Sequence, residues 1–538
     1  MAVVTYNQKE LCKFVGKDIS LKEIENLITM LGMSLEKIEG NEITLDVTPN
    51  RIDMLSVEGL GRAMSSFLNI KTGLRTYEIL KSDYQLQTDS SVNSVRPFIV
   101  SAVVKNLNIT QECFDYLIQL QEKIHETFGR KRRKVSIGIH NLDVVKFPIL
   151  YKAFKPKELS FIALDSSTSL SLEEILETHP KGKEYAHILK GIPKVPIVID
   201  SKNNVLSFPP IINSKLTEVT TKTKNLFIEV TGTSENAIQT TLSIILAALA
   251  DRGGKIYSVK SQLSTPDMKG TEMKLNPKNI FKILGIEISA NQTKTLLERM
   301  GYSVNTGKGT TVQIPAYRAD VIHEIDLIED VAIAFDYNKI EPELPNLTTS
   351  GKLLNSFDNL KNLLIGSGFN QVITMTLTNP KQNYENMQLP INDCVEIKNP
   401  TTEEFSIMRT SIIPSLLSVF AQNKNQKTPQ KLFEIGQCFE IHSNKLYQKT
   451  KLTVAILHSQ TSVTEIKSIG EIILQELGDY GIERADYDYF IRGRSGSIKI
   501  NNKKTGLFGE IHPQVLNNFD LEQPVSCLEI ELEAKDIS

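Results

Sequence analysis

The chain has 538 residues, of which 40% are hydrophobic and 23% are charged, and its formal net charge is −2 at pH 7. This length exceeds what one hydrophobic core supports, so we expect three or four domains of ordinary globular composition. Because 61 basic side chains nearly balance 63 acidic ones, no global attraction to nucleic acid is expected. Any such contact must come from a local patch or a partner chain.

The cysteines and the apolar stretches indicate where in the cell the protein is expected to act. Five scattered cysteines without a CxxC pair argue against a zinc ribbon and a disulfide framework and favour the reducing cytoplasm. The first residues lack the basic region and long apolar run of a signal peptide. The most apolar stretch, AIQTTLSIILAALA at 237–250, is too short and too interrupted to span a membrane. We therefore expect a cytoplasmic protein without membrane contact.

Residues 1–83 are predicted to form a small N-terminal α/β domain. A stretch of helical period, LKEIENLITMLGMSLEKIEG, ends at a glycine, and EITLDVTPNR reads as a strand that enters a Pro-Asn turn. Asp53 is predicted to cap the next helix. The turn at residues 49–51 with Asp53 is interpreted as a structural cap in preference to a ligand site. The apolar stripe of that helix comprises Met54, Val57, Leu60, Met64 and Phe67.

Residues 84–259 are predicted to form a mixed α/β domain. The strand RPFIVSAVVKNL precedes the helix CFDYLIQLQEKIHETFG, a basic run and the strand VSIGIH. The segments KVPIVID and VLSFPPIIN, joined by SKNN, read as a hairpin. The domain closes with NLFIEVTGTSENAIQTTLSIILAALADRGG, a strand and a helix that ends at glycine.

The remaining residues are predicted to form two further domains. Residues 260–345 show the order helix, helix, short hairpin, helix, which suits a winged-helix-like module. Residues 346–538 alternate long helices with strands such as QKLFEIGQCFEI and LTVAILHS, which indicates an antiparallel sheet flanked by helices. The fold class is therefore α/β and α+β, in several domains.

Four carboxylates stand out in PAYRADVIHEIDLIEDVAIAFDY, residues 315–337. Asp326, Glu329 and Asp330 are spaced i, i+3 and i+4 on one face of a predicted helix, and Asp320 in the preceding segment can fold over that face. Hard cations such as magnesium take oxygen ligands of this kind. The alternative is the solvated face of an amphipathic helix, which the pattern alone favours. The apolar stripe opposite consists of Leu327, Ile328, Val331, Ala332 and Phe335.

Long stretches in one order along the whole chain point to a known family. They include DVTPNRIDMLSVEGLGRA, GRKRRKVSIGIHNLD, LSFPPIINSKLTEVT, NLFIEVTGT, the acidic segment above, and MRTSIIPSLLSVFAQNKNQKTPQKLFEIG. Together these resemble the beta subunit of phenylalanyl-tRNA synthetase in its shorter archaeal-type form. One departure is Ile52, where that family usually carries proline.

The resemblance implies a metal and an editing activity. In that family the four acids of the small domain are magnesium ligands, and their spacing here matches each. The second domain of the family resembles an editing domain that hydrolyses Tyr-tRNA(Phe). Such editing is needed because a phenylalanine pocket cannot strongly reject an analogue with one added hydroxyl. The editing candidates here are His140, Asp143, Asn213 and Thr217, placed in loops at the ends of predicted strands. A structural hydrogen-bonding role is the alternative for each histidine.

The resemblance also assigns aminoacylation to a partner. The C-terminal region is similar to a degenerate class II catalytic domain, and Gln430 and Lys431 stand where an Arg-x-Glu pair would contact ATP. We therefore expect ATP-dependent activation on an alpha subunit, in an α2β2 tetramer that binds tRNA(Phe). The alternative is a non-catalytic tRNA-binding or assembly protein, and the missing arginines disfavour a self-sufficient ligase. The extra tRNA-binding domains of the bacterial form are not seen.

The run Arg130 to Lys134, RKRRK, is the one dense basic cluster of the sequence. Contact with tRNA phosphates is one interpretation, and salt would weaken such a contact. A solvated helix end is the other, since cations favour helix C-termini. The sequence leaves both open.

Overall fold

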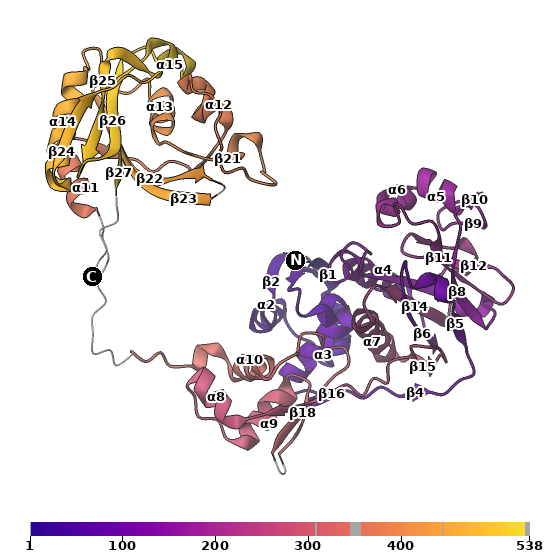
Figure 1. The fold of residues 1–538 in the computed structure, drawn as a ribbon. Helices are drawn as coiled ribbons and strands as arrows, with labels where there is room; N and C mark the ends of the chain where they lie inside the picture. Colours follow the sequence, from indigo (N-terminus) through magenta and orange to yellow (C-terminus); the bar gives the residue numbers. More distant parts are fainter. Residues whose placement is uncertain (1, 307–308, 345–356, 444, 533–538) are drawn as a thin grey trace. The chain divides into compact units, whose positions relative to one another are not determined.

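The computed structural model describes residues 2–306, 309–344, 357–443 and 445–532. The chain divides into two compact units, Met1–Leu344 and Pro345–Ser538, which are traced by colour in Figure 1 and are treated separately below. Within the described ranges, no helix combines the length and the apolar character needed to cross a bilayer.

The first unit begins with a three-stranded antiparallel sheet in the order β1-β3-β2. The side chain of Ser56 accepts the N–H of Gly59 at 2.9 Å and caps the third helix, so the prediction of Asp53 as its cap is wrong. Asp53 lies one turn earlier, where Arg51 binds both its oxygens at 2.9 Å. The elements are β1 (Ala2–Asn7), α1 (Gln8–Val15), α2 (Leu21–Met30), β2 (Ser34–Glu39), β3 (Glu42–Val47), the 3-10 helix η1 (Ile52–Leu55) and α3 (Val57–Phe67).

Two five-stranded sheets build the middle of the first unit, in the orders β4-β15-β6-β14-β7 and β13-β12-β11-β8-β5. The predicted hairpin is confirmed, because β11 pairs antiparallel with β12. The strands are β4 (Ile79–Leu80), β5 (Leu86–Thr88), β6 (Phe98–Lys105), β7 (Val135–Asn141), β8 (Ile149–Phe154), β11 (Val195–Ile199), β12 (Val205–Phe208), β13 (Ile212–Asn213), β14 (Leu226–Gly232) and β15 (Lys255–Ser258). The other elements of this part are α4 (Gln111–Glu126), β9 (Ser160–Ile162), β10 (Ser169–Ser171), α5 (Leu172–Thr178), α6 (Pro180–Tyr185) and α7 (Glu235–Asp251).

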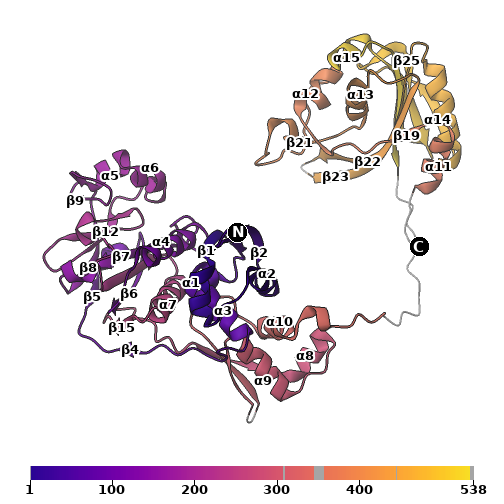
Figure 2. The ribbon, with the colours of Figure 1, turned by 180° about the vertical axis from the view of Figure 1, so that it is seen from behind.

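The alternation of side chains along β6 gives the first of these sheets two buried faces. Val100, Ala102 and Val104 join the cluster that contains the apolar residues of α4 and α7. Ile99 and Val103 point the other way, into a cluster shared with the second sheet. The helix α7 packs along β6 and β14, as Figures 1 and 2 show from opposite sides. The sheet is therefore covered by helices on one face and by the second sheet on the other.

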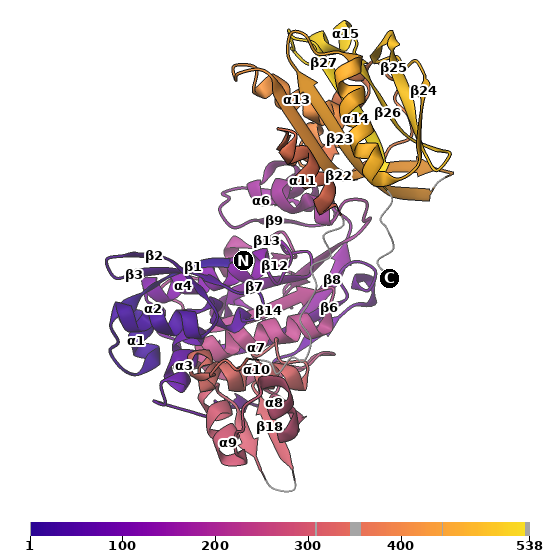
Figure 3. The same ribbon diagram turned by 90° about the vertical axis from the view of Figure 1, so that its left-hand side faces the viewer.

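A small third part completes the first unit. The predicted order of helix, helix, hairpin and helix is found, and the strand β16, which the sequence analysis missed, precedes it and pairs with β18. One buried apolar cluster runs through Leu11 of α1, Leu246 of α7 and Leu327 of α10, and α3 packs against both α7 and α9 (Figure 3). The elements are β16 (Thr271–Leu275), α8 (Pro277–Leu284), α9 (Ala290–Arg299), β17 (Ser303–Asn305), β18 (Thr310–Ile314) and α10 (Glu324–Phe335).

The second unit contains a seven-stranded sheet in the order β19-β22-β23-β27-β26-β25-β24. All its pairs are antiparallel, as predicted, except the parallel edge pair of β19 with β22. Leu432, Ala455 and Cys527 pack in the cluster that includes α13, whereas Phe433 and Val454 pack in the cluster that includes α11 and α14. The sheet therefore has helices on both faces.

The bounds of the second unit are as follows. Its elements are α11 (Asp358–Gly366), β19 (Asn370–Gln371), β20 (Leu377–Thr378), α12 (Pro380–Asn383), β21 (Ile407–Met408), α13 (Ile413–Gln422), β22 (Gln430–His442), β23 (Lys445–Leu457), α14 (Val463–Leu477), β24 (Tyr480–Arg484), β25 (Phe490–Ile500), β26 (Lys503–Ile511), α15 (Pro513–Asn518) and β27 (Val525–Leu532).

Candidate functional site

A hollow of about 320 Å³ lies in the middle of the first unit. Its walls come from α4, β7, β12, β13 and β14, through Glu122, Ser136, Ser207, Asn213 and Glu229. The predicted residue Asn213 therefore reaches this hollow. Because the two five-stranded sheets and α4 all contribute, the pocket depends on their packing and not on one loop.

A buried polar network lies beside this hollow and reaches it through Ser207 and Glu229, whereas its other members, His140 and Thr217, do not line it. The Ser207 hydroxyl donates to Glu229 at 2.7 Å, and His140 Nδ1 lies 2.8 Å from the Thr217 hydroxyl. The second ring nitrogen of His140 is 3.8 Å from the Glu229 carboxylate. Within the described part of the chain, neither this nitrogen nor the second oxygen of Glu229 has a hydrogen-bond partner. Two buried polar atoms are thus left available, which is costly unless something binds them.

Two of the predicted candidates, His140 and Thr217, are in contact in the structure. They do not lie in loops at strand ends, as was predicted. His140 is fully buried inside β7, and Thr217 ends the short 3-10 helix η5 (Lys215–Thr217), so His140 is not in a loop. Gly138 makes the arrangement possible, since a Cβ there would collide with the Glu229 carboxylate and the His140 ring.

Asp143 lies apart from this network. It belongs to the 3-10 helix η3 (Leu142–Val144), is exposed, and accepts a hydrogen bond from the Asn225 side chain at 2.9 Å. It does not line the hollow. The residue that sequence reasoning missed is Glu229, and its signal was present, because a carboxylate inside the apolar strand run LFIEV is rarely buried without a purpose.

One arginine of the basic run also faces the hollow. Arg132 is buried and donates to the carbonyl of Ile211 at 2.8 Å and to Glu122 at 3.0 Å. His125 accepts the N–H of Ile137 at 2.8 Å, which leaves its other ring nitrogen to donate to Glu122 at 3.2 Å. Although burial opposes it, the bond from His125 and the charge of Arg132 lower the pKa of Glu122 to about 2. Glu122 is therefore a fixed anion on the pocket wall.

Two of the four acids predicted to bind magnesium are bound to an arginine instead. The guanidinium of Arg318 binds both oxygens of Asp320, at 2.8 and 2.7 Å, and one oxygen of Asp330 at 2.7 Å. The Tyr302 hydroxyl donates to the same oxygen of Asp330. Arg318 and Asp330 are buried, so this group is a compensated buried ion cluster.

The other two acids lie on α10 itself, Asp326 half-buried in the first turn and Glu329 in the middle of the helix. Asp326 accepts the N–H groups of Ile322 at 2.9 Å and His323 at 2.7 Å, and so caps the helix. Glu329 is exposed. Partial burial and the charges of the neighbouring carboxylates, Asp330 and Asp326 first, raise the pKa of Glu329. The acids do not share one solvated face, because Asp330 turns inward to Arg318.

The four acids are of the ligand type that magnesium prefers, but their positions do not suit a magnesium site. All four offer the oxygen ligands that the ion prefers. Among the residues that the structure describes, however, no group of three or more His, Cys, Asp or Glu side chains is placed to hold a metal ion. Arg318 already neutralises Asp320 and Asp330, and Asp326 is engaged by the helix start.

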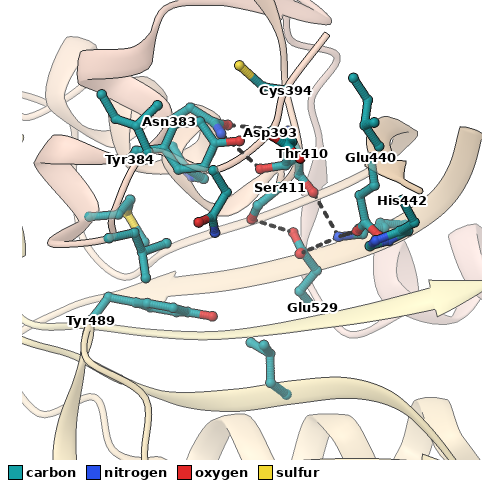
Figure 4. Close-up of a pocket in the computed structure, with 18 of the residues that line it drawn as sticks. Asn383, Tyr384, Asp393, Cys394, Thr410, Ser411, Glu440, His442, Tyr489 and Glu529 are labelled. Carbon is teal, nitrogen blue, oxygen red and sulfur yellow. Dashed lines mark hydrogen bonds and ion pairs between the residues drawn. The ribbon is translucent and has the colours of Figure 1, made fainter. Parts of the chain in front are cut away.

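A larger hollow, of about 1070 Å³, lies in the second unit (Figure 4). Lys451 projects from β23 and donates to the carbonyl of Thr410 at 2.8 Å, to Glu440 at 3.2 Å and to Glu529 at 3.4 Å. Although burial opposes it, the Glu529 and Glu440 carboxylates raise the pKa of Lys451. The Ser411 hydroxyl also donates to Glu529 at 2.9 Å. The charges at the base of this hollow therefore bind one another.

No arginine is among the residues that line this hollow, within the described part of the unit. Lys431 places its ammonium 5.5 Å from the centre of the Phe369 ring, and Gln430 donates to the carbonyl of Asn423 at 2.9 Å. Arg409 is buried and bound to Glu434 at 2.7 Å. Within the described part of the unit, Lys451 is the one lysine or arginine that lines this hollow, and it is already bound to carboxylates.

Comparison with known proteins agrees with these observations. Family models match as follows: the B3/4 domain at residues 87–245, the tRNA synthetase B5 domain at 273–337, and the phenylalanyl tRNA synthetase beta chain CLM domain at 340–532. The phenylalanine–tRNA ligase beta subunit of Archaeoglobus fulgidus is 41% identical over 99% of this chain and 98% of its own length. That of Thermococcus kodakarensis is 40% identical over 98% and 97%. The chain belongs to the phenylalanyl-tRNA synthetase beta subunit family, in its archaeal type.

The match extends to structure for the first unit. A crystal structure of an N-terminal fragment of the phenylalanyl-tRNA synthetase beta subunit from Pyrococcus horikoshii is 39% identical and covers 62% of this chain and 99% of its own length, with a TM-score of 0.60. Glu229 and the hollow beside it belong to the residues that match the B3/4 domain, and the Arg318 cluster belongs to those that match the B5 domain.

His125 predicts a loss of stability in mild acid. Burial lowers the pKa of its ring from 6.5 to about 4, so the unfolded chain takes up this proton first. Stability should therefore fall as the pH drops from about 6.5 to about 4, by up to about 3 kcal/mol, and this contribution should level off below. Urea unfolding of the first unit at pH 7, 5.5 and 4.5 measures the change.

The matched variants are His125→Gln and His187→Gln, the second at an exposed ring that bonds the Glu184 carbonyl. The His125 variant should show a flatter pH dependence in this window, whereas the His187 variant should follow the wild type. An unchanged dependence in His125→Gln would contradict the assignment.

Proposed function

We propose that this chain is the beta subunit of a phenylalanine–tRNA ligase, which attaches phenylalanine to tRNA(Phe) with ATP and releases AMP and diphosphate. The observation that carries the proposal is the similarity to named beta subunits over 99% of this chain. The chain would act in the cytoplasm with alpha subunits in an α2β2 tetramer. It would contribute assembly surface, tRNA contacts and editing.

The proposal includes a division of labour among four segments. Residues 1–83 and 84–259 would form the N-terminal and editing-type domains, residues 260–345 a winged-helix-like domain, and residues 346–538 a class II synthetase-like domain without aminoacylation chemistry. The hollow of the second unit supports the last point, because Lys451 in it is bound by Glu440 and Glu529. Phosphoryl chemistry needs positive charge that is free to meet the phosphates.

Aminoacylation separates this function from its alternatives. The chain alone should not charge tRNA(Phe) with phenylalanine, and the complex co-purified with the alpha subunit should. Activity of the chain alone would contradict the assignment of catalysis to the partner. A stable complex without activity would favour the alternative of a tRNA-binding or assembly protein.

The hollow with Glu229 supports an editing role. The unpaired oxygen of Glu229 would accept a hydrogen bond from the phenol of a tyrosyl group, which a phenylalanyl group cannot donate. A site that leaves a buried polar group unpaired with the wrong ligand discriminates by large factors. Hydrolysis adds the oxygen of water to the ester carbonyl, breaks the bond to the ribose oxygen, and returns the proton to that oxygen. His140, Thr217 and Asn213 would position the groups around the ester, and Asp143 is the weakest candidate.

Replacement of Glu229 by Gln tests this role. Gln keeps the size but loses the charge and one acceptor, so hydrolysis of Tyr-tRNA(Phe) by the complex should slow by about tenfold or more while phenylalanylation stays unchanged. Glu177→Gln, on an exposed part of the same domain, is the matched control. Editing at the wild-type rate in Glu229→Gln, with the fold intact by circular dichroism, would refute it.

The acidic helix remains a proposed magnesium site. Asp326 in the first turn of α10 and Glu329 one turn further along can both be reached from solvent, and magnesium commonly binds one or two carboxylates and keeps several waters. Asp320 and Asp330 would join them, as the family implies, only if the ion displaced Arg318 from these two carboxylates. The ion would supply positive charge that holds the start of α10 in place.

Magnesium binding predicts thermal protection of the chain. At about 100 times the dissociation constant, an ion bound only to the folded state adds about 2.7 kcal/mol, which scanning calorimetry detects as a higher Tm. Glu329→Gln should reduce this protection, and Glu287→Gln, an exposed carboxylate of the same segment, should not. No magnesium effect on the wild type would mean that Arg318 is the cation this site uses.

A further inference from the structure

A third hollow, of about 610 Å³, lies between the N-terminal sheet and the basic run. It joins two motifs that the preceding function leaves unused, the turn at residues 49–51 and the run RKRRK. One wall is apolar and is made by Val47, Pro49, Ile52, Leu55 and Phe128. The cations Arg130, Lys131 and Lys134 also line this hollow.

These three cations are available to a ligand. Arg130 and Lys131 are exposed, and in the described ranges none of the three forms a side-chain ion pair. The Lys134 ammonium lies 4.7 Å from the centre of the Phe128 ring, so positive charge and an aromatic face meet at the floor. The acid beside them, Glu126, is bound to Lys123 at 3.3 Å.

The backbone of the run is held in a conformation that side chains rarely adopt. Arg130, Lys131 and Arg132 have φ values of 51°, 52° and 64°, and three successive left-handed residues without glycine are strained. The turn persists because the N–H of Arg130 bonds the carbonyl of Thr127 at 2.9 Å and that of Arg132 bonds His125 at 3.1 Å. With this backbone, Arg130 and Lys131 line one hollow and the next residue, Arg132, lines another.

The same turn therefore serves two hollows. Arg132 lines the editing-type hollow with Glu229, and Arg130 and Lys131 line the hollow beside Pro49. A strand of RNA whose terminal aminoacyl group enters the first would pass close to the second. A nucleotide combines a flat aromatic base with an anionic phosphate, which matches an apolar wall faced by free cations.

We propose that the hollow between the Pro49 turn and the basic run binds an unpaired nucleotide of the tRNA. The base lies against the wall of Pro49, Ile52 and Phe128, and the adjoining phosphate is held by Arg130 and Lys131. This inference rests on the proposed function, which makes tRNA the partner. It adds a binding site and its ligand class, and it decides between the two interpretations of RKRRK in favour of RNA contact.

The first test uses the complex with the alpha subunit and the double variant Arg130→Gln/Lys131→Gln. The Kd for tRNA(Phe) should rise about tenfold at 100 mM salt. The slope of log K against log salt should become shallower by about 0.7, since the two side chains hold one phosphate and each single-strand phosphate contact contributes about 0.7. The control, Lys17→Gln/Lys22→Gln, removes the same charge from exposed lysines of the N-terminal segment and should change neither value by as much.

The second test asks whether a base is recognised. A short single-stranded RNA carrying 4-thiouridine should crosslink to the peptide that contains Phe128, and inorganic polyphosphate should compete poorly. Equal competition by polyphosphate, or no crosslink to this peptide, would overturn the nucleotide site in favour of a general anion patch or of another location.

The outcomes separate the two proposals. If the wild-type complex binds and charges tRNA(Phe) but the double variant keeps its affinity and salt slope, the nucleotide site is refuted and the ligase function stands. If the wild-type complex binds no tRNA, both are refuted.

Discussion

A buried charge must have a partner, and this constraint decides which charged residues of the chain hold the fold and which remain available. Arg318 is held by Asp320 and Asp330, Arg409 by Glu434, and Arg132 by Glu122. In each case the guanidinium is already engaged by a carboxylate of the chain itself. The availability of a site therefore depends on where such pairing is incomplete.

Among the places in the first unit where pairing is incomplete, two lie beside hollows. One oxygen of Glu229 and one nitrogen of His140 have no partner within the described residues, and the nearby hollow has the size of a small ligand. Arg130 and Lys131 are exposed beside an apolar wall. The turn at residues 130–132 therefore lies between an acceptor without a partner, Glu229, and two exposed cations. In the proposals above, the first would meet the aminoacyl end of a tRNA and the second its nucleotide chain.

The second unit shows the opposite situation. Lys451 sits among carboxylates and a carbonyl in a large hollow and is bound by Glu440 and Glu529 (Figure 4). Burial keeps such a network rigid, since moving one member leaves the others unpaired. The network and the helices on both faces of the sheet therefore stabilise this unit from within.

Local pattern predicted much of the fold, because periodicity reports which face of an element is buried. It predicted the hairpin of β11 and β12, the helix α10 and the antiparallel sheet of the second unit. It failed where the answer lay in contacts distant along the chain. The strand β16 was missed because its pairing with β18 supplies its stability, and Ser56 proved to be the helix cap because Arg51 claims Asp53.

The sequence by itself determined the family, the order of the elements and the presence of the acids and the basic run, since these follow from residue types and their spacing. Only the tertiary structure decided what those residues do. Asp330 turned inward because Arg318 needed a counter-charge, and Asp143 lies on the surface bound to Asn225. Glu229 became the centre of the candidate site because β14 buries it beside His140 and Ser207. Burial and pairing are properties of the packed chain, and spacing in the sequence does not carry them.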